Sequence, residues 1–140
     1  MKRGATAHWE GGLKDGRGSL STTSGVLDKA SYSFATRFED GKGTNPEELI
    51  GAAHAGCFSM ALSMTLEEAG HAPESIDTRA TVSLEQSEGG FAIKAVHLDV
   101  TANVPGIDAS ALEKAANDAK AGCPVSKLFN AEITMEAKLA

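Results

Sequence analysis

Aromatic residues are scarce in this chain, at 5% of 140 residues, with one tryptophan and one tyrosine. Basic residues are also in the minority, with 13 against 19 acidic residues and a net charge of −6. Nucleic acids and anionic membranes bind basic surfaces, so neither is expected as a partner. Two cysteines are too few for a secreted disulfide scaffold.

The N-terminus lacks the features of a signal peptide. Lys2 and Arg3 are basic, but no apolar run follows them. We therefore expect a cytoplasmic, reducing location. The length predicts one domain over residues 1–140, and a hydrophobic content of 41% excludes a disordered chain.

The apolar part of the sequence consists largely of small residues, with 23 alanines beside 15 glycines. Each small side chain buries little area, at about 25 cal/mol for each Å². We expect a partner subunit to complete the core.

The clearest helix begins at Pro46, with Asn45 or Thr44 as its cap, and ends near Gly70. Between Leu49 and Leu66 it has 18 residues without a formal charge, which is long enough to cross a membrane. We reject that interpretation because no basic flank orients the segment and polar or small residues interrupt it. The interrupting residues are Gly51, His54, Gly56, Ser59, Ser63 and Thr65. A helix that is apolar all round is instead buried all round, so sheet should wrap it on several sides.

The rest of the chain predicts two more helices and several strands. A second helix begins after Asp108 and ends at Gly122, and Cys123-Pro124 opens a short third helix. Alternation predicts strands over 5–9, 18–22, 32–38, 80–84, 91–100 and 133–139, with a bulge near Ala95 where the inward parity changes. This order predicts an α+β fold with helices packed on antiparallel sheets.

Cys57 and Cys123 are the candidates for chemistry, and each allows two interpretations. Cys57 lies mid-helix among apolar residues, where a thiol is usually an inert small hydrophobe unless a cation lowers its pKa. Cys123, at a helix N-terminus, has the setting that favours a thiolate. The two are 66 positions apart, so only the fold decides whether they meet.

An arginine is the cation that Cys57 would need. Arg37 interests us most, because small neighbours on its predicted strand leave room for a long side chain, although it is equally read as a solvated arginine. Glu47 and Cys57 are ten residues apart on one helix, a rise of about 15 Å, so they do not touch. A guanidinium held by the carboxylate could reach both.

Other chemistries find no support in the sequence. The four histidines form no cluster with metal-ligand spacing, and no Cys-x-x-Cys is present, so no metal site is predicted. The glycines over 11–18 lack the strand-to-helix context of a phosphate-binding loop. No cofactor is expected.

The segment Gly43-Thr44-Asn45-Pro46-Glu47-Glu48-Leu49-Ile50-Gly51-Ala52-Ala53-His54-Ala55-Gly56-Cys57-Phe58-Ser59-Met60-Ala61 resembles the signature of the osmotically inducible protein C (OsmC) family. Ala121-Gly122-Cys123-Pro124-Val125-Ser126 and Thr36-Arg37-Phe38 add to the likeness. It covers nearly the whole chain and favours the OsmC branch over the organic hydroperoxide resistance (Ohr) branch.

The resemblance implies an intertwined homodimer whose sheets enclose long central helices, with active sites at the subunit interface. It implies a thiol peroxidase that reduces organic hydroperoxides and, less well, hydrogen peroxide. Cys57 would be the peroxidatic nucleophile and Cys123 the resolving thiol, with a dithiol as reductant. Arg37 and Glu47 would activate the thiolate, with Arg17 as the reserve arginine. His54, Phe58, Met60 and Met64 form the predicted substrate pocket.

Two other functions remain open at this stage. The same cysteines would also serve a redox sensor or thiol–disulfide exchange protein, which oxidises once instead of turning over. A structural or ligand-binding stress protein would carry both thiols as inert core residues.

Overall fold

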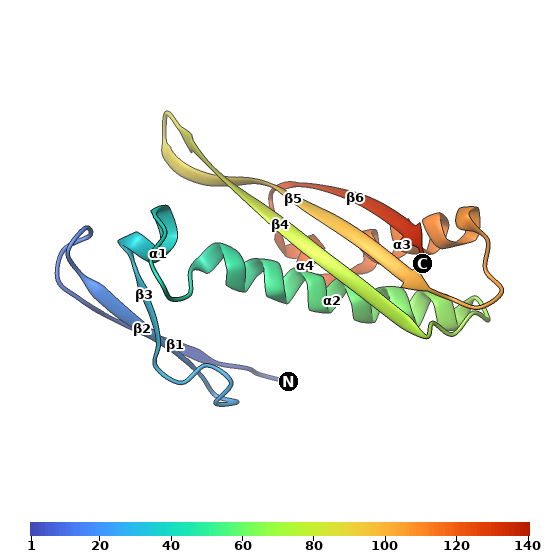
Figure 1. Cartoon of the computed structure of the whole chain (residues 1–140), viewed down its shortest axis with the longest axis horizontal. Helices are drawn as coiled ribbons and strands as arrows, with labels where there is room; N and C mark the ends of the chain where they lie inside the picture. Colours follow the sequence, from blue (N-terminus) through green and yellow to red (C-terminus); the bar gives the residue numbers. More distant parts are fainter. The chain divides into compact units, whose positions relative to one another are not determined.

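The computed structural model describes all 140 residues. It divides into two compact units, Met1–Leu49 and Ile50–Ala140. The elements of the first unit are β1 (Ala5–Glu10), β2 (Arg17–Thr22), β3 (Ala30–Ser33) and α1 (Phe34–Phe38). Helix α2 (Pro46–Glu68) begins at its end and leads into β4 (Ser75–Ser87), β5 (Gly90–Asn103), α3 (Ala109–Gly122), α4 (Pro124–Leu128) and β6 (Glu132–Leu139) (Figure 1). The predicted α+β class is confirmed.

The first unit is built on an antiparallel sheet in the order β1-β2-β3. Trp9, Gly18 and Tyr32 are paired across its three strands, and the two aromatic rings lie 5.3 Å apart. A Cβ on Gly18 would lie 2.3 Å from the Tyr32 ring. Glycine is therefore required here, because it gives the rings room to pack over the middle strand.

The predicted strand over 32–38 is wrong in its second half. The strand ends at Ser33, and residues 34–38 form helix α1. A capping box starts the helix, because the Ser33 hydroxyl accepts from the Thr36 N–H while the Thr36 hydroxyl accepts from the Ser33 N–H. Phe34 and Phe38 then stack 4.8 Å apart at the helical i, i+4 spacing, which the alternating pattern concealed.

Helix α2 begins at Pro46 and ends at Glu68, close to its predicted bounds. The Asn45 side chain caps it by accepting from the Glu48 N–H at 2.9 Å, and Gly70 follows the helix with a φ of +84°. The helix is long and apolar enough to cross a membrane, a property it shares with core helices of soluble proteins. Within one chain it is buried on one face only, so the expected burial on all sides is not seen here. The buried residues are Gly51, His54, Phe58, Leu62 and Leu66.

The sheet of the second unit has the order β4-β5-β6. The β4–β5 hairpin is antiparallel, and its register shifts between Ser83 and Leu84, opposite Ala95 and Ile93. The predicted bulge near Ala95 is thus confirmed. The expectation of a wholly antiparallel sheet is wrong, because β6 pairs with β5 in parallel. The two strands are joined through α3 and α4, and a crossover of this length returns the chain in the same direction.

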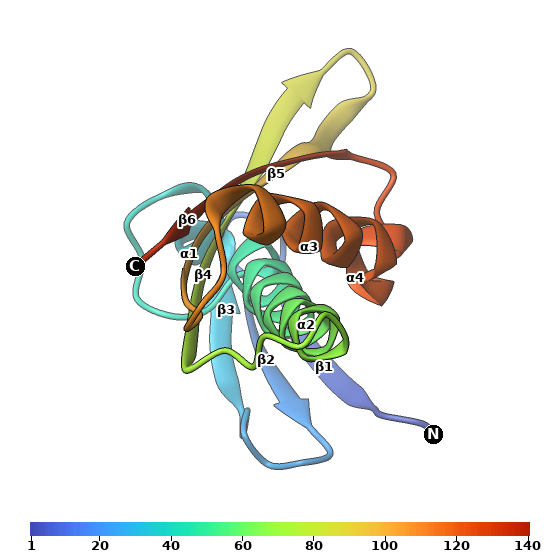
Figure 2. The same ribbon diagram turned by 90° about the vertical axis from the view of Figure 1, so that its right-hand side faces the viewer.

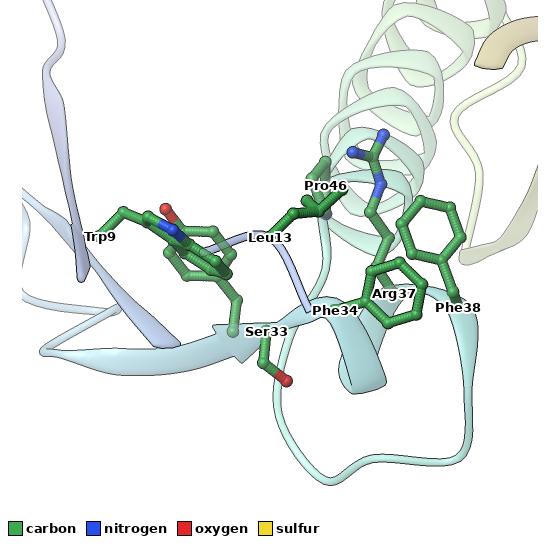
Figure 3. Close-up of a pocket in the computed structure, with 8 residues that line it drawn as sticks. Trp9, Leu13, Ser33, Phe34, Arg37, Phe38 and Pro46 are labelled. Atoms are coloured by element: carbon green, nitrogen blue, oxygen red, sulfur yellow. The ribbon is translucent and has the colours of Figure 1, made fainter. Parts of the chain in front are cut away.

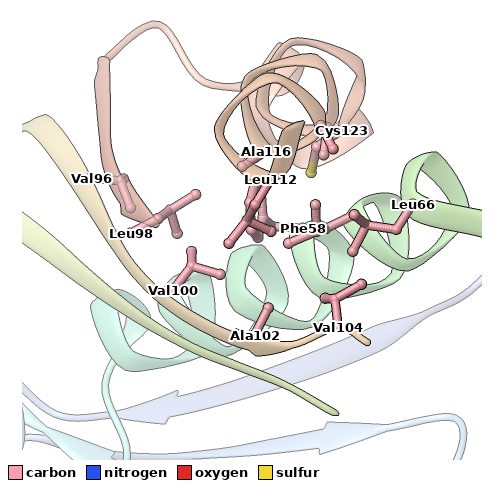
Figure 4. Close-up of a cluster of buried hydrophobic side chains, with 13 residues drawn as sticks. Phe58, Leu66, Val96, Leu98, Val100, Ala102, Val104, Leu112, Ala116 and Cys123 are labelled. Atoms are coloured by element: carbon pink, nitrogen blue, oxygen red, sulfur yellow. The ribbon is translucent and has the colours of Figure 1, made fainter. Parts of the chain in front are cut away.

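The hydrophobic core of the second unit lies between α2, α3 and the inner face of β5. Figure 2 shows α2 and α3 side by side, and Figure 4 shows their side chains converging with those of β5. Alternate residues of β5 point into this core: Val96, Leu98, Val100 and Ala102. From α3, Leu112 and three alanines complete this core. Cys123 lies at one end of the same core, with no exposed surface.

Candidate active site

Cys57 lies on α2 at the wall of an open groove. The groove has a volume of about 600 Å³ and lies between α2 and the ends of α3 and α4. Its lining is mostly apolar: Cys57, Met60, Ala61, Met64, Thr65, Asp118, Ala119, Gly122 and Pro124. Cys57 is partly exposed, so a small molecule that enters the groove reaches its sulfur.

Cys123 is held by the junction of α3 and α4. Its N–H donates to Ala119 at the end of α3, and its carbonyl accepts from Lys127 in α4. Pro124 fills the first position of α4 and needs no hydrogen-bond partner there. The Cys123 side chain is completely buried and faces α2.

The fold brings the two sulfur atoms together. Cys57 Sγ and Cys123 Sγ are 3.1 Å apart, and both cysteines are reduced. A disulfide bond is about 2.05 Å long, so a small movement of the two side chains would be enough to form one.

Burial and hydrogen bonding shift the pKa values of the two thiols in opposite directions. Burial, followed by the hydrogen bond with Cys123, raises the pKa of Cys57. For Cys123, burial also acts to raise the pKa, but four hydrogen-bonding interactions together outweigh it and lower the pKa. In order, they come from the Ser126 N–H, the Cys57 thiol, the Ser126 hydroxyl and the Val125 N–H. Within this unit the pKa of Cys123 is therefore lowered and that of Cys57 raised, while one hydrogen bond joins the two sulfur atoms.

Ser126 is a site residue that the sequence analysis missed. It is 8% exposed and lies at the third position of α4, where a side chain folds back toward the residue that caps the helix, here Cys123. Its Oγ is also 2.8 Å from His54 Nε2 on α2. The signal in the sequence was a hydroxyl three residues after Cys123.

In the first unit, Arg37 and Glu47 form a bidentate ion pair. Arg37 Nη2 lies 2.7 Å from Glu47 Oε1, and Arg37 Nε lies 3.2 Å from each carboxylate oxygen. Figure 3 shows the Arg37 side chain between Phe38 and Pro46, at the rim of a cavity of about 200 Å³. The guanidinium carbon is 5.3 Å from the centre of the Phe38 ring. This arrangement fixes the guanidinium and leaves its Nη1 edge for another ligand.

The loop before α2 keeps Arg37 and Glu47 together. The Asn45 side chain donates to the Thr36 carbonyl, and the Thr44 N–H donates to the Ser31 carbonyl. Gly43 has a φ of +147°, and a Cβ there would lie 2.7 Å from the Ser31 carbonyl oxygen. The loop is therefore tied to both the sheet and α1.

Arg17, the reserve arginine, is held much less firmly. Its side chain is 87% exposed and lies 3.7 Å from Glu10 on the neighbouring strand. An exposed ion pair of this kind contributes little energy and little orientation.

The structure places the four residues of the predicted substrate pocket on two different faces of α2. His54 and Phe58 have no exposed surface and point into the core, on the face of α2 away from solvent. Met60 and Met64 do line the groove beside Cys57 and are 76% and 57% exposed. His54 and Phe58 are four residues apart, as are Met60 and Met64, and residues four apart share one face of a helix. The offset between the two pairs places them on different faces of α2. No group of three His, Cys, Asp or Glu side chains in the chain is placed to hold a metal ion.

Comparison with known proteins gives a consistent result. The family described as OsmC-like protein matches residues 39–138. A protein of Escherichia coli (strain K12), named peroxiredoxin OsmC, is 59% identical over 133 residues, which are 95% of this chain and 93% of that protein.

Two solved structures have the same fold. The organic hydroperoxide resistance protein OhrB of Bacillus subtilis aligns with a TM-score of 0.76 and 29% identity, over 100% of this chain and 98% of that one. An OsmC-like protein of Mycoplasma pneumoniae gives a TM-score of 0.77 at 14% identity, over 100% and 98% of the two chains. The family match, the high identity to the E. coli protein and the shared fold lead to one conclusion: this chain belongs to the OsmC family.

Proposed function

We propose that this protein is a thiol peroxidase that reduces organic hydroperoxides, and less efficiently hydrogen peroxide, to alcohols or water. The observation that carries the proposal is the reduced pair Cys57 and Cys123, with sulfur atoms 3.1 Å apart at the side of an apolar groove. The relative named peroxiredoxin OsmC supports it at 59% identity.

The two cysteines have different access to solvent, which suggests different roles. Cys57 lines the groove and is partly exposed, so it is the sulfur that meets a peroxide. Cys123 is fully buried and meets only Cys57. Cys57 is therefore the peroxidatic cysteine and Cys123 the resolving cysteine.

Within the second unit, Cys57 lacks the cation that a peroxidatic thiolate requires. Burial raises its pKa, and no positive charge is among the causes of the shift. Arg37, held by Glu47 and with its Nη1 edge free of that pair, is our candidate for the missing charge. It would act on Cys57 of its own subunit or of a partner and lower the pKa of the thiol. Arg17 is the reserve.

The reaction has three steps. The Cys57 thiolate attacks the terminal peroxide oxygen, the O–O bond breaks, and the alkoxide takes a proton and leaves as alcohol, with Cys57 as a sulfenic acid. A guanidinium beside the sulfur stabilises both the thiolate and the alkoxide. The Cys123 thiolate then attacks the Cys57 sulfur, so that hydroxide leaves and a disulfide forms. A dithiol reductant restores both thiols by exchange and becomes a disulfide itself.

The groove favours peroxides with a carbon tail. Met60 and Met64 are flexible and polarizable, and they line the groove next to the reacting sulfur. An alkyl or aryl substituent would bury their exposed surface, whereas hydrogen peroxide has nothing to place there.

A homodimer is the assembly we propose. The face of α2 with Met60 and Met64 is apolar and exposed in the single chain, and the small residues of the sequence leave a modest core. A second copy would cover this face and place the active site at the subunit interface. We also propose a cytoplasmic location, where a reduced pair of thiols is maintained.

Intact-mass measurement after one equivalent of cumene hydroperoxide tests the proposed function. We expect a loss of two mass units in the wild type, from the Cys57–Cys123 disulfide. Cys123→Ser should instead stop at a sulfenic acid, and Cys57→Ser should not react. A sensor would oxidise once but fail to turn over with a dithiol, and peroxidase activity retained by Cys57→Ser would refute our assignment.

A further inference from the structure

His54 and Ser126 form a buried polar pair beside the two sulfur atoms. His54 has no exposed surface, and its Nε2 lies 2.8 Å from the Ser126 hydroxyl. The Phe129 ring meets the imidazole edge-on, with centres 5.2 Å apart, and so fixes its orientation. A pair of this kind costs free energy to bury, and hydrophobic residues would fill the same space.

The other imidazole nitrogen shows which way the hydrogen bond runs. His54 Nδ1 is buried and has no hydrogen-bond partner. A buried N–H without an acceptor is rarer than a buried acceptor without a donor, so the imidazole proton belongs on Nε2. Burial also lowers the pKa of His54, which keeps the ring neutral with one proton. His54 Nε2–H therefore donates to Ser126 Oγ.

The single proton of Ser126 is then free to point at Cys123. Ser126 is the third residue of α4 and Cys123 is its cap, so the two residues lie about one helical turn apart. The Ser126 hydroxyl interacts with the Cys123 thiol, in addition to the backbone N–H groups of Val125 and Ser126. Cys57 is the titratable side chain that acts directly on Cys123, and Asp118 beside the groove is paired with Lys114.

We propose that His54 and Ser126 are positioning residues for the resolving step: His54 orients the Ser126 hydroxyl, which donates to the Cys123 sulfur and keeps that sulfur aimed at Cys57. No bond is made or broken in either residue. The Cys123 thiolate is the nucleophile that attacks the Cys57 sulfenic acid, so the pair acts on the step in which the disulfide forms. This inference rests on the proposed function, because only a peroxidase needs a rapid resolving step.

The test compares two steps in the same protein. Reduced Ser126→Ala is mixed with t-butyl hydroperoxide, and both peroxide consumption and disulfide mass are followed in time. We expect disulfide formation to slow about tenfold, and by more than peroxide consumption, since a hydrogen bond to the attacking sulfur is lost. Ser59→Ala is the matched control, because it removes a hydroxyl on α2 that is bonded to a different side chain, Thr78, at 2.8 Å.

Substitutions of His54 separate orientation from simple packing. His54→Gln keeps an N–H donor near Ser126 and should form the disulfide at close to the wild-type rate. His54→Leu fills the space without a donor and should be as slow as Ser126→Ala. A wild-type rate of disulfide formation in both Ser126→Ala and His54→Leu would overturn the proposal.

A titration without peroxide keeps this inference distinct from the proposed function. In a Cys57→Ser background, thiolate absorbance near 240 nm reports Cys123 alone. Adding Ser126→Ala should raise the pKa of Cys123 by about one unit. An unchanged titration refutes the role of Ser126, whether or not the protein consumes peroxides.

Discussion

The Arg37 guanidinium donates hydrogen bonds to the Glu47 carboxylate from both Nε and Nη2, and the shortest distance, 2.7 Å, is between Nη2 and Oε1. The two residues lie on different helices, α1 and α2, and are ten positions apart. Glu47 is only 13% exposed, so little water competes for the pair. The orientation of Arg37 therefore depends on Glu47 more than on any other side chain.

Glu47→Gln should slow the reaction of Cys57 with peroxide by roughly 10- to 100-fold, because the guanidinium that we propose to activate the thiol loses its fixed orientation. Stopped-flow consumption of cumene hydroperoxide under single-turnover conditions measures this step. Glu48→Gln, one residue along the same turn, is the control and should retain the wild-type rate. Equal rates for the two variants would remove Glu47 from the site.

The choice between the two arginines is open to a direct test. Arg37→Met should reduce the second-order rate constant with peroxide by about 10²- to 10³-fold, as removal of an oxyanion-stabilising donor does. Arg37→Lys should recover little of it, since an ammonium does not reproduce a two-pronged contact. Arg17→Met serves as the comparison. If it causes the larger loss, Arg17 is the activating residue.

Acid should destabilise the folded protein partly through His54. Burial lowers the pKa of His54 in the folded state, while the unfolded chain binds the proton near pH 6.5. The unfolded state thus binds more protons below about pH 6.5, so the stability contributed by neutral His54 is complete above that pH and declines as the pH falls. Urea unfolding between pH 5 and 8 should show a smaller decline in His54→Gln than in the wild type.

Met60 and Met64 should determine the preference among peroxides. Their double substitution by serine should lower kcat/KM for cumene hydroperoxide about tenfold relative to hydrogen peroxide, because apolar contact area with the tail is lost. The ratio of the two substrates cancels general effects on stability. Leu128→Ser, which changes another exposed apolar residue (78% exposed) outside the groove lining, is the control. An unchanged ratio in the double variant would place the tail elsewhere.

Gly18→Ala should destabilise the first unit by about 1–3 kcal/mol. The added methyl group would lie 2.3 Å from the Tyr32 ring and 2.8 Å from the His8 carbonyl oxygen. Gly89→Ala meets nothing within 4 Å and should be nearly neutral. Thermal melts followed by tryptophan fluorescence suit this test, since Trp9 packs on the same ring. Similar melting temperatures for the two variants would contradict the packing argument.

The sequence determined most of the local structure. Caps and breakers placed α2 and α3 almost to the residue, and a change of parity located the bulge near Ala95. The region of Arg37 was misread because aromatic residues four apart fit both a strand and a helix, and the Ser33–Thr36 capping box decided between them. Where the spacing of apolar residues fits a helix and a strand equally well, a capping residue is needed to decide between the two.

The site was less accessible to sequence reasoning than the fold. Cys57 and Cys123 are 66 positions apart, and their contact depends on how α4 closes over α2, which no local pattern encodes. For the same reason Ser126 was overlooked and His54 was placed in the groove, although it faces the core. The resemblance to a family identified both cysteines but gave no indication of what surrounds Cys123.

The parallel pairing of β5 with β6 has a consequence for the order in which the protein matures. β6 is synthesised after both cysteines, and it is the strand that completes the sheet against which α3 packs. Until β6 pairs with β5, that sheet is incomplete and α3, which ends in the cap residue Cys123, lacks part of the surface it packs on. The position of Cys123 therefore depends in part on a strand that is synthesised after both cysteines and carries no cysteine itself.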